Sequence, residues 1–374
     1  MEKTALETKP HFMILDGLRG VAAILILIFH VFETYTIGTD KPLLVGHGYL
    51  AVDFFFGLSG FVIGFAYDDR WNRMSLRSFL KRRIIRLHPM VVLGMVIGAV
   101  FFYFGSSFSP EGEVSKAFHL IADTPVWKML FYMILGMFLI PTPPSIDIRG
   151  WREMYTLDAP TWSLFFEYIA YILYALIVRK FSKIALSILV FLSACSTIYL
   201  MLTQGDVIGG WEFTENHLYI GFTRLFYPFF SGLLLYRLGR LIRIKNAFPL
   251  CCLLLVILLA LPRIGGDEVW KNGIYEGLAI LVAFPLIILT GAGGEIKNKT
   301  SEKWCRFLGD ISFPLYIVHY PLIYVFTGYV TDNNYSFAET WPEALLVFNG
   351  SILIAYAALK WYDIPIRKWL TKKF

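Results

Sequence analysis

The chain has 374 residues, of which 57% are hydrophobic and only 17% are charged, and its formal net charge is +6. This composition excludes an ordinary water-soluble domain and is typical of an all-α, polytopic membrane protein. The basic residues fall in short runs between apolar segments, as they do in cytoplasmic loops, so the positive charge does not indicate a nucleic-acid partner. We therefore expect the protein to be embedded in membrane lipid and to have no nucleic-acid partner.

Ten apolar segments approach the roughly 20 residues that a helix needs to cross the hydrocarbon of a bilayer. They cover residues 14–35, 47–67, 88–106, 161–178, 184–203, 217–236, 247–262, 272–291, 309–330 and 342–361. A further apolar stretch, 126–140, is shorter and is followed by a proline-rich turn. Its length leaves open whether it crosses the membrane.

Basic residues predict the orientation of these helices. The loop 68–88 is rich in Lys and Arg and should face the cytoplasm. If 126–140 crosses the membrane, the later basic clusters (179–183, 237–245, 297–306 and 367–373) all face outside; if it does not, they all face the cytoplasm. We therefore expect ten transmembrane helices, both termini in the cytoplasm, and 126–140 as a non-spanning or re-entrant segment.

The first apolar segment carries an arginine and a histidine. Arg19 and His30 are eleven residues apart, which on a helix is about three turns and roughly 16 Å, so both lie on nearly one face. An ionisable side chain at such a depth is costly in lipid and therefore indicates a functional site. Glu33 follows His30 by three residues and shares its face.

Two carboxylates are expected at the depth of His30. Asp53 lies in the outer third of segment 47–67, and Glu167 lies about two turns inside segment 161–178. Beside an imidazole, these carboxylates would fix its tautomer, as a general base requires. The alternative is a structural network that only joins the helices.

Arginines on the cytoplasmic side predict an anion site. Arg83 and Arg86 are one helical turn apart, and Arg19 lies at the same side of the membrane. The planar fork of arginine suits phosphate groups. The alternative is a positive-inside signal, which is our interpretation of Arg70 and Arg73.

Segment 309–330 contains prolines that interrupt the helical hydrogen bonds, which membrane proteins tolerate where a helix lines a cavity. Tyr316 and His319 share a face there, where a packing role fits as well as a role in substrate binding. The four cysteines show no metal-like spacing, and we expect no metal.

Together these motifs resemble the acyltransferase 3 family of integral membrane acyltransferases. The matching motifs are Leu15–His30 with its Arg-x10-His pattern, Asp53–Phe61, Arg83–Arg86, Trp162–Glu167, Leu308–His319 and Asp363–Arg367. They follow one another along the whole chain, so we expect a single acyltransferase domain over residues 1–374 with no appended soluble domain.

The resemblance implies a cytoplasmic acyl-coenzyme A donor, expected to be acetyl-CoA, and an acceptor hydroxyl on a carbohydrate or glycoconjugate at the outer side. It also implies that Arg19 and His30 are essential and that Arg83 and Arg86 serve the donor. We therefore predict His30, Asp53 and Glu167 as catalytic residues and Arg19, Arg83 and Arg86 as the donor site. The predicted substrate contacts are Glu33, Trp162, Ser163, Tyr316 and His319.

The predicted enzyme is an O-acetyltransferase of the bacterial cytoplasmic membrane that modifies a polysaccharide of the cell envelope. The main alternative is a proton-coupled transporter or flippase, which would also carry His, Asp and Glu within the membrane. We find no inverted repeat that supports this alternative. The sequence leaves open the acceptor, the acyl length, the oligomeric state, and whether His30 acts as a base or carries the acyl group.

Overall fold

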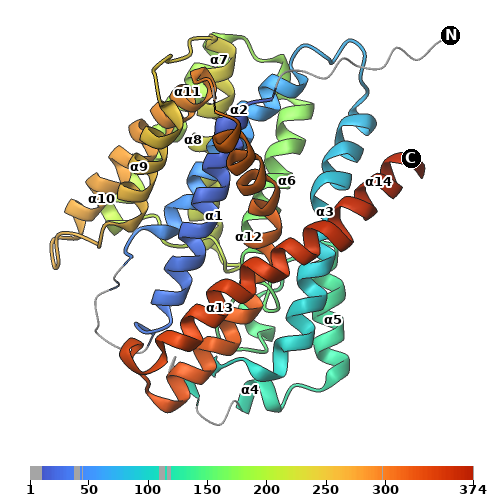
Figure 1. Cartoon of the computed structure of the whole chain (residues 1–374), viewed down its shortest axis with the longest axis vertical. Helices are drawn as coiled ribbons and strands as arrows, with labels where there is room; N and C mark the ends of the chain where they lie inside the picture. Colours follow the sequence, from blue (N-terminus) through green and yellow to red (C-terminus); the bar gives the residue numbers. More distant parts are fainter. Residues whose placement is uncertain are drawn as a thin grey trace.

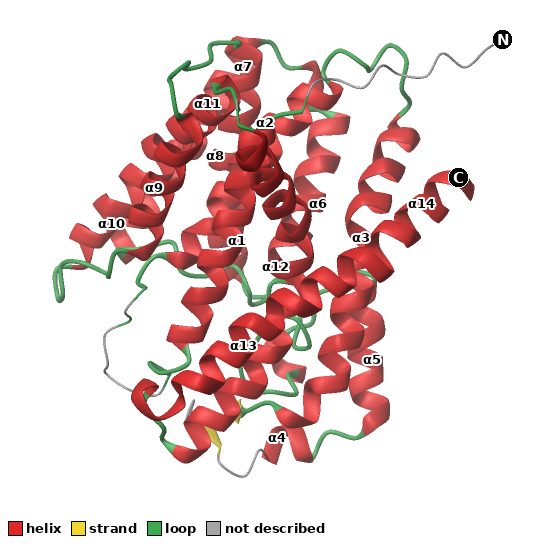
Figure 2. Cartoon of the chain, viewed as in Figure 1, coloured by secondary structure: helices red, strands yellow, loops and turns green. Residues whose placement is uncertain are grey.

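The computed structural model describes residues 11–37, 43, 45–108, 114–115, 119–296 and 298–373, which are mostly helical (Figure 2). The helices are α1 (Met13–Glu33), α2 (Ala51–Tyr67), α3 (Leu76–Phe101), α4 (His119–Ala122), α5 (Val126–Met137), α6 (Thr161–Leu176), α7 (Lys183–Gln204), α8 (Glu215–Leu238), α9 (Ala247–Ala260), α10 (Val269–Leu278), α11 (Phe284–Gly293), α12 (Lys299–Asn333), α13 (Phe337–Ala358) and α14 (Ile364–Lys373). Two short strands, β1 (Ser107–Phe108) and β2 (Val114–Ser115), pair in an antiparallel way.

Eight helical stretches within the described residues are long and apolar enough to cross a membrane. The chain is therefore a multi-pass integral membrane protein, as its composition predicts. Eight of the ten predicted spans coincide with these stretches. The other two, 161–178 and 247–262, correspond to α6 and α9, which have 16 and 14 residues and fall short of the roughly 20 that a span needs.

Helix α1 lies in the middle of the molecule, where it packs along α12, and α2 packs along α8 (Figure 1). Helix α12 also contacts α3 and α13. Helix α5, which contains most of segment 126–140, has 12 residues, about 18 Å of helix. It packs beside one half of α3 (Figure 1) and is too short to cross the hydrocarbon alone.

The later part of the segment between α5 and α6 is buried within the protein. Ile148, Arg149 and Asp158 are at most 2% exposed. A Cβ atom at Gly98 of α3 would lie 2.1 Å from the carbonyl oxygen of Leu157, so only glycine lets the segment approach α3 this closely. The structure therefore places this part of the segment against α3.

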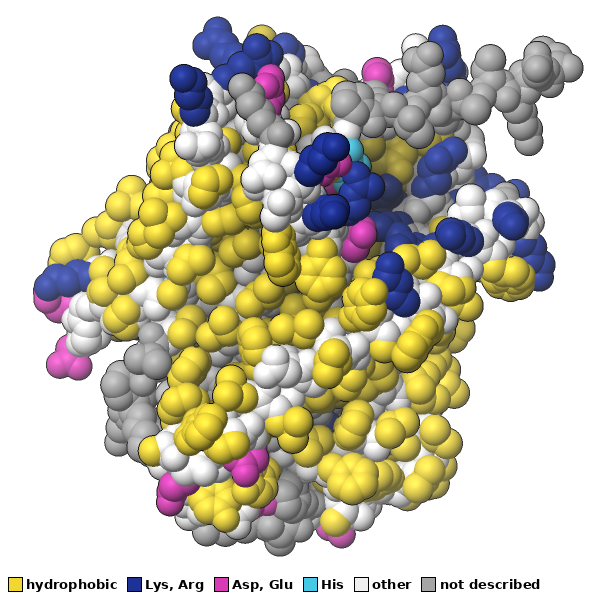
Figure 3. All heavy atoms as spheres, viewed as in Figure 1, with side chains coloured by type: hydrophobic (Ala, Val, Ile, Leu, Met, Phe, Trp, Pro, Cys, Tyr) yellow, Lys and Arg dark blue, Asp and Glu magenta, His cyan; other side chains and the backbone are white. Residues whose placement is uncertain are grey.

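Charged side chains are unevenly distributed over the surface. On the face seen in Figure 3, Lys and Arg gather towards the end where α1 begins and α14 ends, whereas hydrophobic side chains cover most of the rest. This separation along the long axis is what the positive-inside rule leads us to expect of a membrane protein.

Candidate active site

A cavity of about 290 Å³ lies between α1, α2, α3, α6 and α12. It is near the Lys- and Arg-rich end of the molecule, where Figure 3 shows a recess bordered by basic side chains. The predicted site residues in its lining are Arg19, Arg83, Arg86, Ser163, Glu167 and Tyr316. The structure therefore brings all three predicted donor-site arginines into one cavity. Among the described residues, no three His, Cys, Asp or Glu side chains gather closely enough to hold a metal ion.

Arg83 is held by two tyrosines. Its Nη2 donates a hydrogen bond to the hydroxyl of Tyr67 at 2.5 Å, and its guanidinium lies 4.9 Å from the ring centre of Tyr67 and 5.6 Å from that of Tyr171. Cation–π contacts of this kind fix a guanidinium without neutralising it. The Nε of Arg83 is buried and finds no hydrogen-bond partner in the described part of the chain. Arg83 is thus oriented and retains a donor for an anion.

Glu167 belongs to the same part of the cavity. Its carboxylate accepts a hydrogen bond from Ser59 at 2.6 Å and another from Tyr171, and it interacts electrostatically with Arg83. The hydroxyls of Ser163 and Tyr316 are 2.8 Å apart. Glu167 therefore lies in the same cavity as the three predicted donor-site arginines.

The mouth of the cavity contains an ion pair on α1. Nη1 of Arg19 lies 3.0 Å from Oδ1 of Asp16, one turn earlier. His11 lies 2.7 Å from the other oxygen of this carboxylate, and the hydrogen bond raises the pKa of the His11 imidazole. Asp16 thus fixes the position of Arg19.

His30 lies deeper along α1, and Glu33 orients it. Its Nδ1 is 2.8 Å from the carboxylate of Glu33, so Nδ1 carries the proton and donates it. The imidazole packs edge-on against the ring of Tyr320, with centres 4.8 Å apart. This contact leaves the second nitrogen, Nε2, as the hydrogen-bond acceptor of the ring.

His319 connects the cavity to His30. Its ring centre is 6.1 Å from that of Tyr316, which lines the cavity, and 5.4 Å from that of His30. Nδ1 of His319 donates to the carbonyl of Leu315 at 3.0 Å. Nε2 is buried and has no partner among the described residues. A row of rings thus runs from the arginine-lined cavity to His30.

Asp53 forms an ion pair with Arg224 and does not contact His30. Its carboxylate accepts hydrogen bonds from Arg224 at 2.7 and 3.3 Å, and both residues are almost completely buried. The guanidinium of Arg224 also lies 5.1 Å from the ring of Trp162. The expected meeting of Asp53 and Glu167 with His30 is not observed: the three groups lie in separate networks.

Arg224 is the residue that the sequence analysis missed in this network. It lies inside the apolar segment 217–236, and the rule that drew attention to His30 applies equally to it. A buried arginine within the membrane needs a carboxylate, so Arg224 could have predicted the partner of Asp53.

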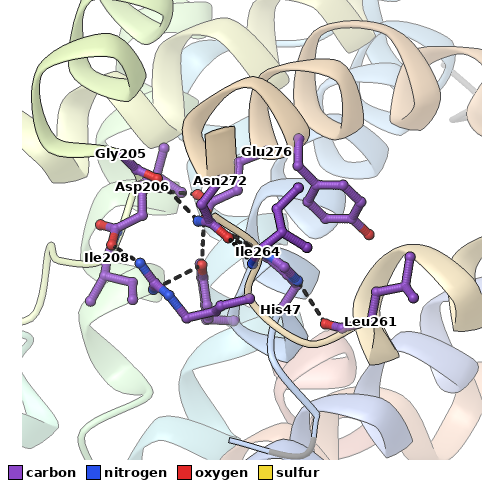
Figure 4. Close-up of polar contacts among 12 residues, drawn as sticks. His47, Gly205, Asp206, Ile208, Leu261, Ile264, Asn272 and Glu276 are labelled. Carbon is purple, nitrogen blue, oxygen red and sulfur yellow. Dashed lines mark hydrogen bonds and ion pairs between the residues drawn. The ribbon is translucent and has the colours of Figure 1, made fainter. Parts of the chain in front are cut away.

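A second buried network adjoins this ion pair (Figure 4). His47 contacts the carbonyl of Leu261 at 2.7 Å and the side-chain oxygen of Asn272 at 3.0 Å, and Asn272 donates to Glu276 at 2.6 Å. Tyr49 donates to Glu276 as well. These residues join the loops before α2 and α10, and because the groups satisfy one another, they form a structural clamp.

A third cluster lies on the other side of His30. The guanidinium of Arg149 is 3.7 Å from the ring centre of Tyr324, whose hydroxyl donates to Glu153. The ring of Tyr324 in turn packs 4.7 Å from that of Tyr320. Burial raises the pKa of Glu153 to about 8. No periodic pattern marks this irregular segment in the sequence, so its proximity to His30 is visible only in the structure.

Comparison with known proteins agrees with the sequence motifs. The family model described as an acyltransferase domain matches residues 14–360. The peptidoglycan O-acetyltransferase OatA of Listeria monocytogenes is 22% identical over 98% of this chain and 58% of its own length. A putative O-acetyltransferase of Staphylococcus aureus is 25% identical over 95% of this chain and 57% of its own length.

Protein 2 in the picA locus of Rhizobium radiobacter is 31% identical over 52% of this chain and 95% of its own length. The chain thus spans less than three fifths of the two O-acetyltransferase relatives. No solved structure matches it. Since the family model covers nearly the whole chain, the protein belongs to the acyltransferase 3 family, as its motifs predict.

Proposed function

We propose that the protein is an O-acetyltransferase that takes an acetyl group from cytoplasmic acetyl-CoA and transfers it to a carbohydrate hydroxyl at the outer side of the bacterial cytoplasmic membrane. One observation carries this proposal: Arg19, Arg83, Arg86 and Tyr316 line one cavity, and a row of packed rings leads from Tyr316 through His319 to His30. Anion-binding and proton-accepting groups thus lie at the two ends of one path.

The arginine-lined end is the proposed donor site. Guanidinium groups bind phosphate oxygens through paired N–H donors, and the diphosphate of coenzyme A supplies such oxygens. The thioester arm then runs inwards beside α1. The separation of Arg19 from His30, roughly 16 Å along the helix, sets the length that this arm spans.

At the inner end, His30 is the proposed general base. Nε2 takes the proton of the acceptor hydroxyl while that oxygen attacks the thioester carbonyl carbon. The carbon–sulfur bond breaks as the new ester bond forms, and the leaving thiolate takes the proton back from His30. The bond from Nδ1 to Glu33 holds the imidazole in the tautomer that this transfer needs.

The proposed acceptor is a sugar hydroxyl of an envelope polysaccharide. The relative from Listeria monocytogenes is named for O-acetylation of peptidoglycan, which makes cell-wall glycans the first class to test. Burial of Glu153 and Arg149 next to Tyr320 gives the acceptor side polar groups within an otherwise apolar bundle.

Acetyl transfer by the full chain in detergent tests the proposal. Purified protein receives radiolabelled acetyl-CoA and a soluble glycan fragment, and labelled glycan is measured for the wild type, for H30A, and for H88A as a control histidine outside the cavity lining. We expect H30A alone to lose about 10²–10⁴-fold in rate. Unchanged transfer in H30A would contradict the proposed role of His30.

The same donor without acceptor separates the two chemical routes. A covalent route through His30 leaves label on the wild-type protein and none on H30A, because His30 then carries the acyl group. Direct transfer leaves neither protein labelled, although the wild type still acetylates glycan when it is added.

A further inference from the structure

A fourth arginine lies beside the donor cavity although it does not line it. Arg367 is on α14, which packs against α3. Arg86 of α3 is close enough to Arg367, and also to Arg19 and Arg83, to interact electrostatically with each of them. Arg19, Arg83 and Arg86 line one cavity, and α14 carries Arg367 beside α3, so four guanidinium groups lie at one end of the molecule, where Figure 3 shows the recess bordered by basic side chains.

Asp363 fixes the position of Arg367. The carboxylate of Asp363 is 2.7 Å from Nη2 of Arg367, one turn later, and Asp363 is only 3% exposed. Asp363 ends a π-helical turn, Leu359–Asp363, that separates α13 from α14. Such turns rotate the helix that follows and are frequent at functional sites. Here the turn joins α13 to the helix that presents Arg367 beside α3.

The cluster retains unused hydrogen-bond donors. Nε of Arg83 and Nε of Arg367 are both buried without a partner among the described residues. Asp16 pairs with Arg19 and Asp363 pairs with Arg367, and Asp363 also interacts electrostatically with Arg86. The four guanidinium groups exceed these two carboxylates by two positive charges, and unpartnered buried N–H groups are unfavourable unless an anion binds. The pattern is that of a site for an anion with several phosphate groups.

We propose that Arg367, held by Asp363, forms with Arg86 a separate subsite for the 3′-phosphate on the ribose of coenzyme A. This inference rests on the proposed function, because it takes acyl-CoA as the donor. Coenzyme A carries its diphosphate next to the thioester arm and its 3′-phosphate on the far side of the ribose. The cavity-lining Arg19 and Arg83 are placed for the diphosphate, and Arg367, outside the lining, is placed for the group farther from the thioester.

The subsite makes the donor site selective between coenzyme A and dephospho-coenzyme A, which lacks only the 3′-phosphate. The affinities of both compounds are measured by isothermal titration with the full chain in detergent. We compare the wild type with R367Q and with K372Q, which removes one exposed positive charge from the same helix. A hydrogen-bonded charge contact corresponds to about a tenfold or larger difference in affinity.

We expect the wild type and K372Q to bind coenzyme A about tenfold more tightly than dephospho-coenzyme A. R367Q is expected to bind both compounds with the lower affinity. R367K is a second variant for the case that R367Q does not fold. It keeps the positive charge but loses the planar guanidinium that binds phosphate through two N–H groups, so we expect it to keep only part of the difference in affinity between the two compounds.

Two results would overturn the subsite. The first is equal binding of the two compounds by the wild type. The second is a full preference for coenzyme A in R367Q, as expected if Arg367 instead binds a lipid phosphate. A wild type that binds neither compound would instead overturn the proposed donor, and a glycan acetylation assay with other acetyl donors would then separate this failure from the other two.

Discussion

The carboxylate of Glu33 lies 2.8 Å from Nδ1 of His30, one helical turn earlier on α1. Both ends of this contact come from a single helix, so its geometry follows from the helical repeat and does not depend on how helices are packed. The orienting carboxylate of His30 is therefore Glu33, which we predicted as a substrate contact, while Asp53 and Glu167 are engaged elsewhere.

Replacement of this carboxylate tests the orienting role. E33Q keeps an oxygen that accepts the proton of Nδ1 but removes the charge that stabilises the imidazolium during transfer. We expect kcat to fall about 10–100-fold, since a hydrogen bond to a charged group contributes about 1.5–3 kcal/mol, while KM for the donor stays the same. E302Q is the control, because the side chain of Glu302 is 45% exposed. A rise in KM with unchanged kcat would instead indicate that Glu33 binds substrate.

Because Asp53 and Arg224 form a buried ion pair, we expect a substitution of Asp53 to lower the stability of the protein and not its catalytic activity. D53N leaves the guanidinium of Arg224 buried without its charge partner, which costs about 3–5 kcal/mol. We expect a lower melting temperature and poor yield, whereas the double variant D53L/R224M regains folding because no charge remains unpaired. Activity per folded molecule should then be near that of the wild type. A double variant that folds but is inactive would show that Asp53 takes part in the reaction.

Close contact between α2 and α8 explains Gly60, the second glycine of the Asp53–Phe61 motif. A Cβ atom at Gly60 would lie 1.8 Å from the carbonyl oxygen of Phe229, so the helices would have to separate. We expect G60A to yield little monodisperse protein in fluorescence-detected size-exclusion chromatography. G350A is the matched control, because the nearest atom to its Cβ would be 3.9 Å away. Normal yield of G60A would mean that α2 and α8 move apart at little cost.

Asp158 makes stability depend on pH. Burial raises the pKa of its carboxyl to about 8, whereas the group in an unfolded chain titrates near 4. Between these values the folded protein holds a proton that the unfolded chain has lost. This stabilisation is complete below the lower pKa and is lost as the pH rises to about 8, at up to about 1.4 kcal/mol per pH unit.

D158N should remove this part of the pH dependence. The hydroxyl of Thr161 donates to Oδ2 of Asp158 at 3.0 Å, and an asparagine oxygen accepts the same bond. The fall in melting temperature from pH 6 to pH 8.5 should be smaller in D158N than in the wild type, and Glu153 should contribute to the slope that remains. Equal slopes in the two proteins would contradict a protonated Asp158.

Local patterns in the sequence predicted much of the fold. Uninterrupted apolar runs place most of the membrane helices, because burial of the backbone in lipid requires long apolar helices wherever the chain crosses. Helical spacing likewise predicts that Arg83 and Arg86 share a face and that Glu33 lies beside His30. These relations depend only on the 3.6-residue repeat within one helix.

Those local patterns could not predict the contacts between helices. Depth in the membrane placed Asp53, Glu167 and His30 at similar levels, but depth does not fix the rotation of a helix about its own axis. Rotation directs Asp53 to Arg224 and Glu167 to Ser59. It is set by packing such as that of α2 against α8.

The sequence by itself therefore determined the membrane class, the family and the pairs that lie on one helix. Only the tertiary structure decided which side chains from different helices meet: Asp53 with Arg224, and His319 with His30. The reason is physical. Periodicity acts over a few residues, whereas these contacts join segments that only the packing of the whole bundle brings together.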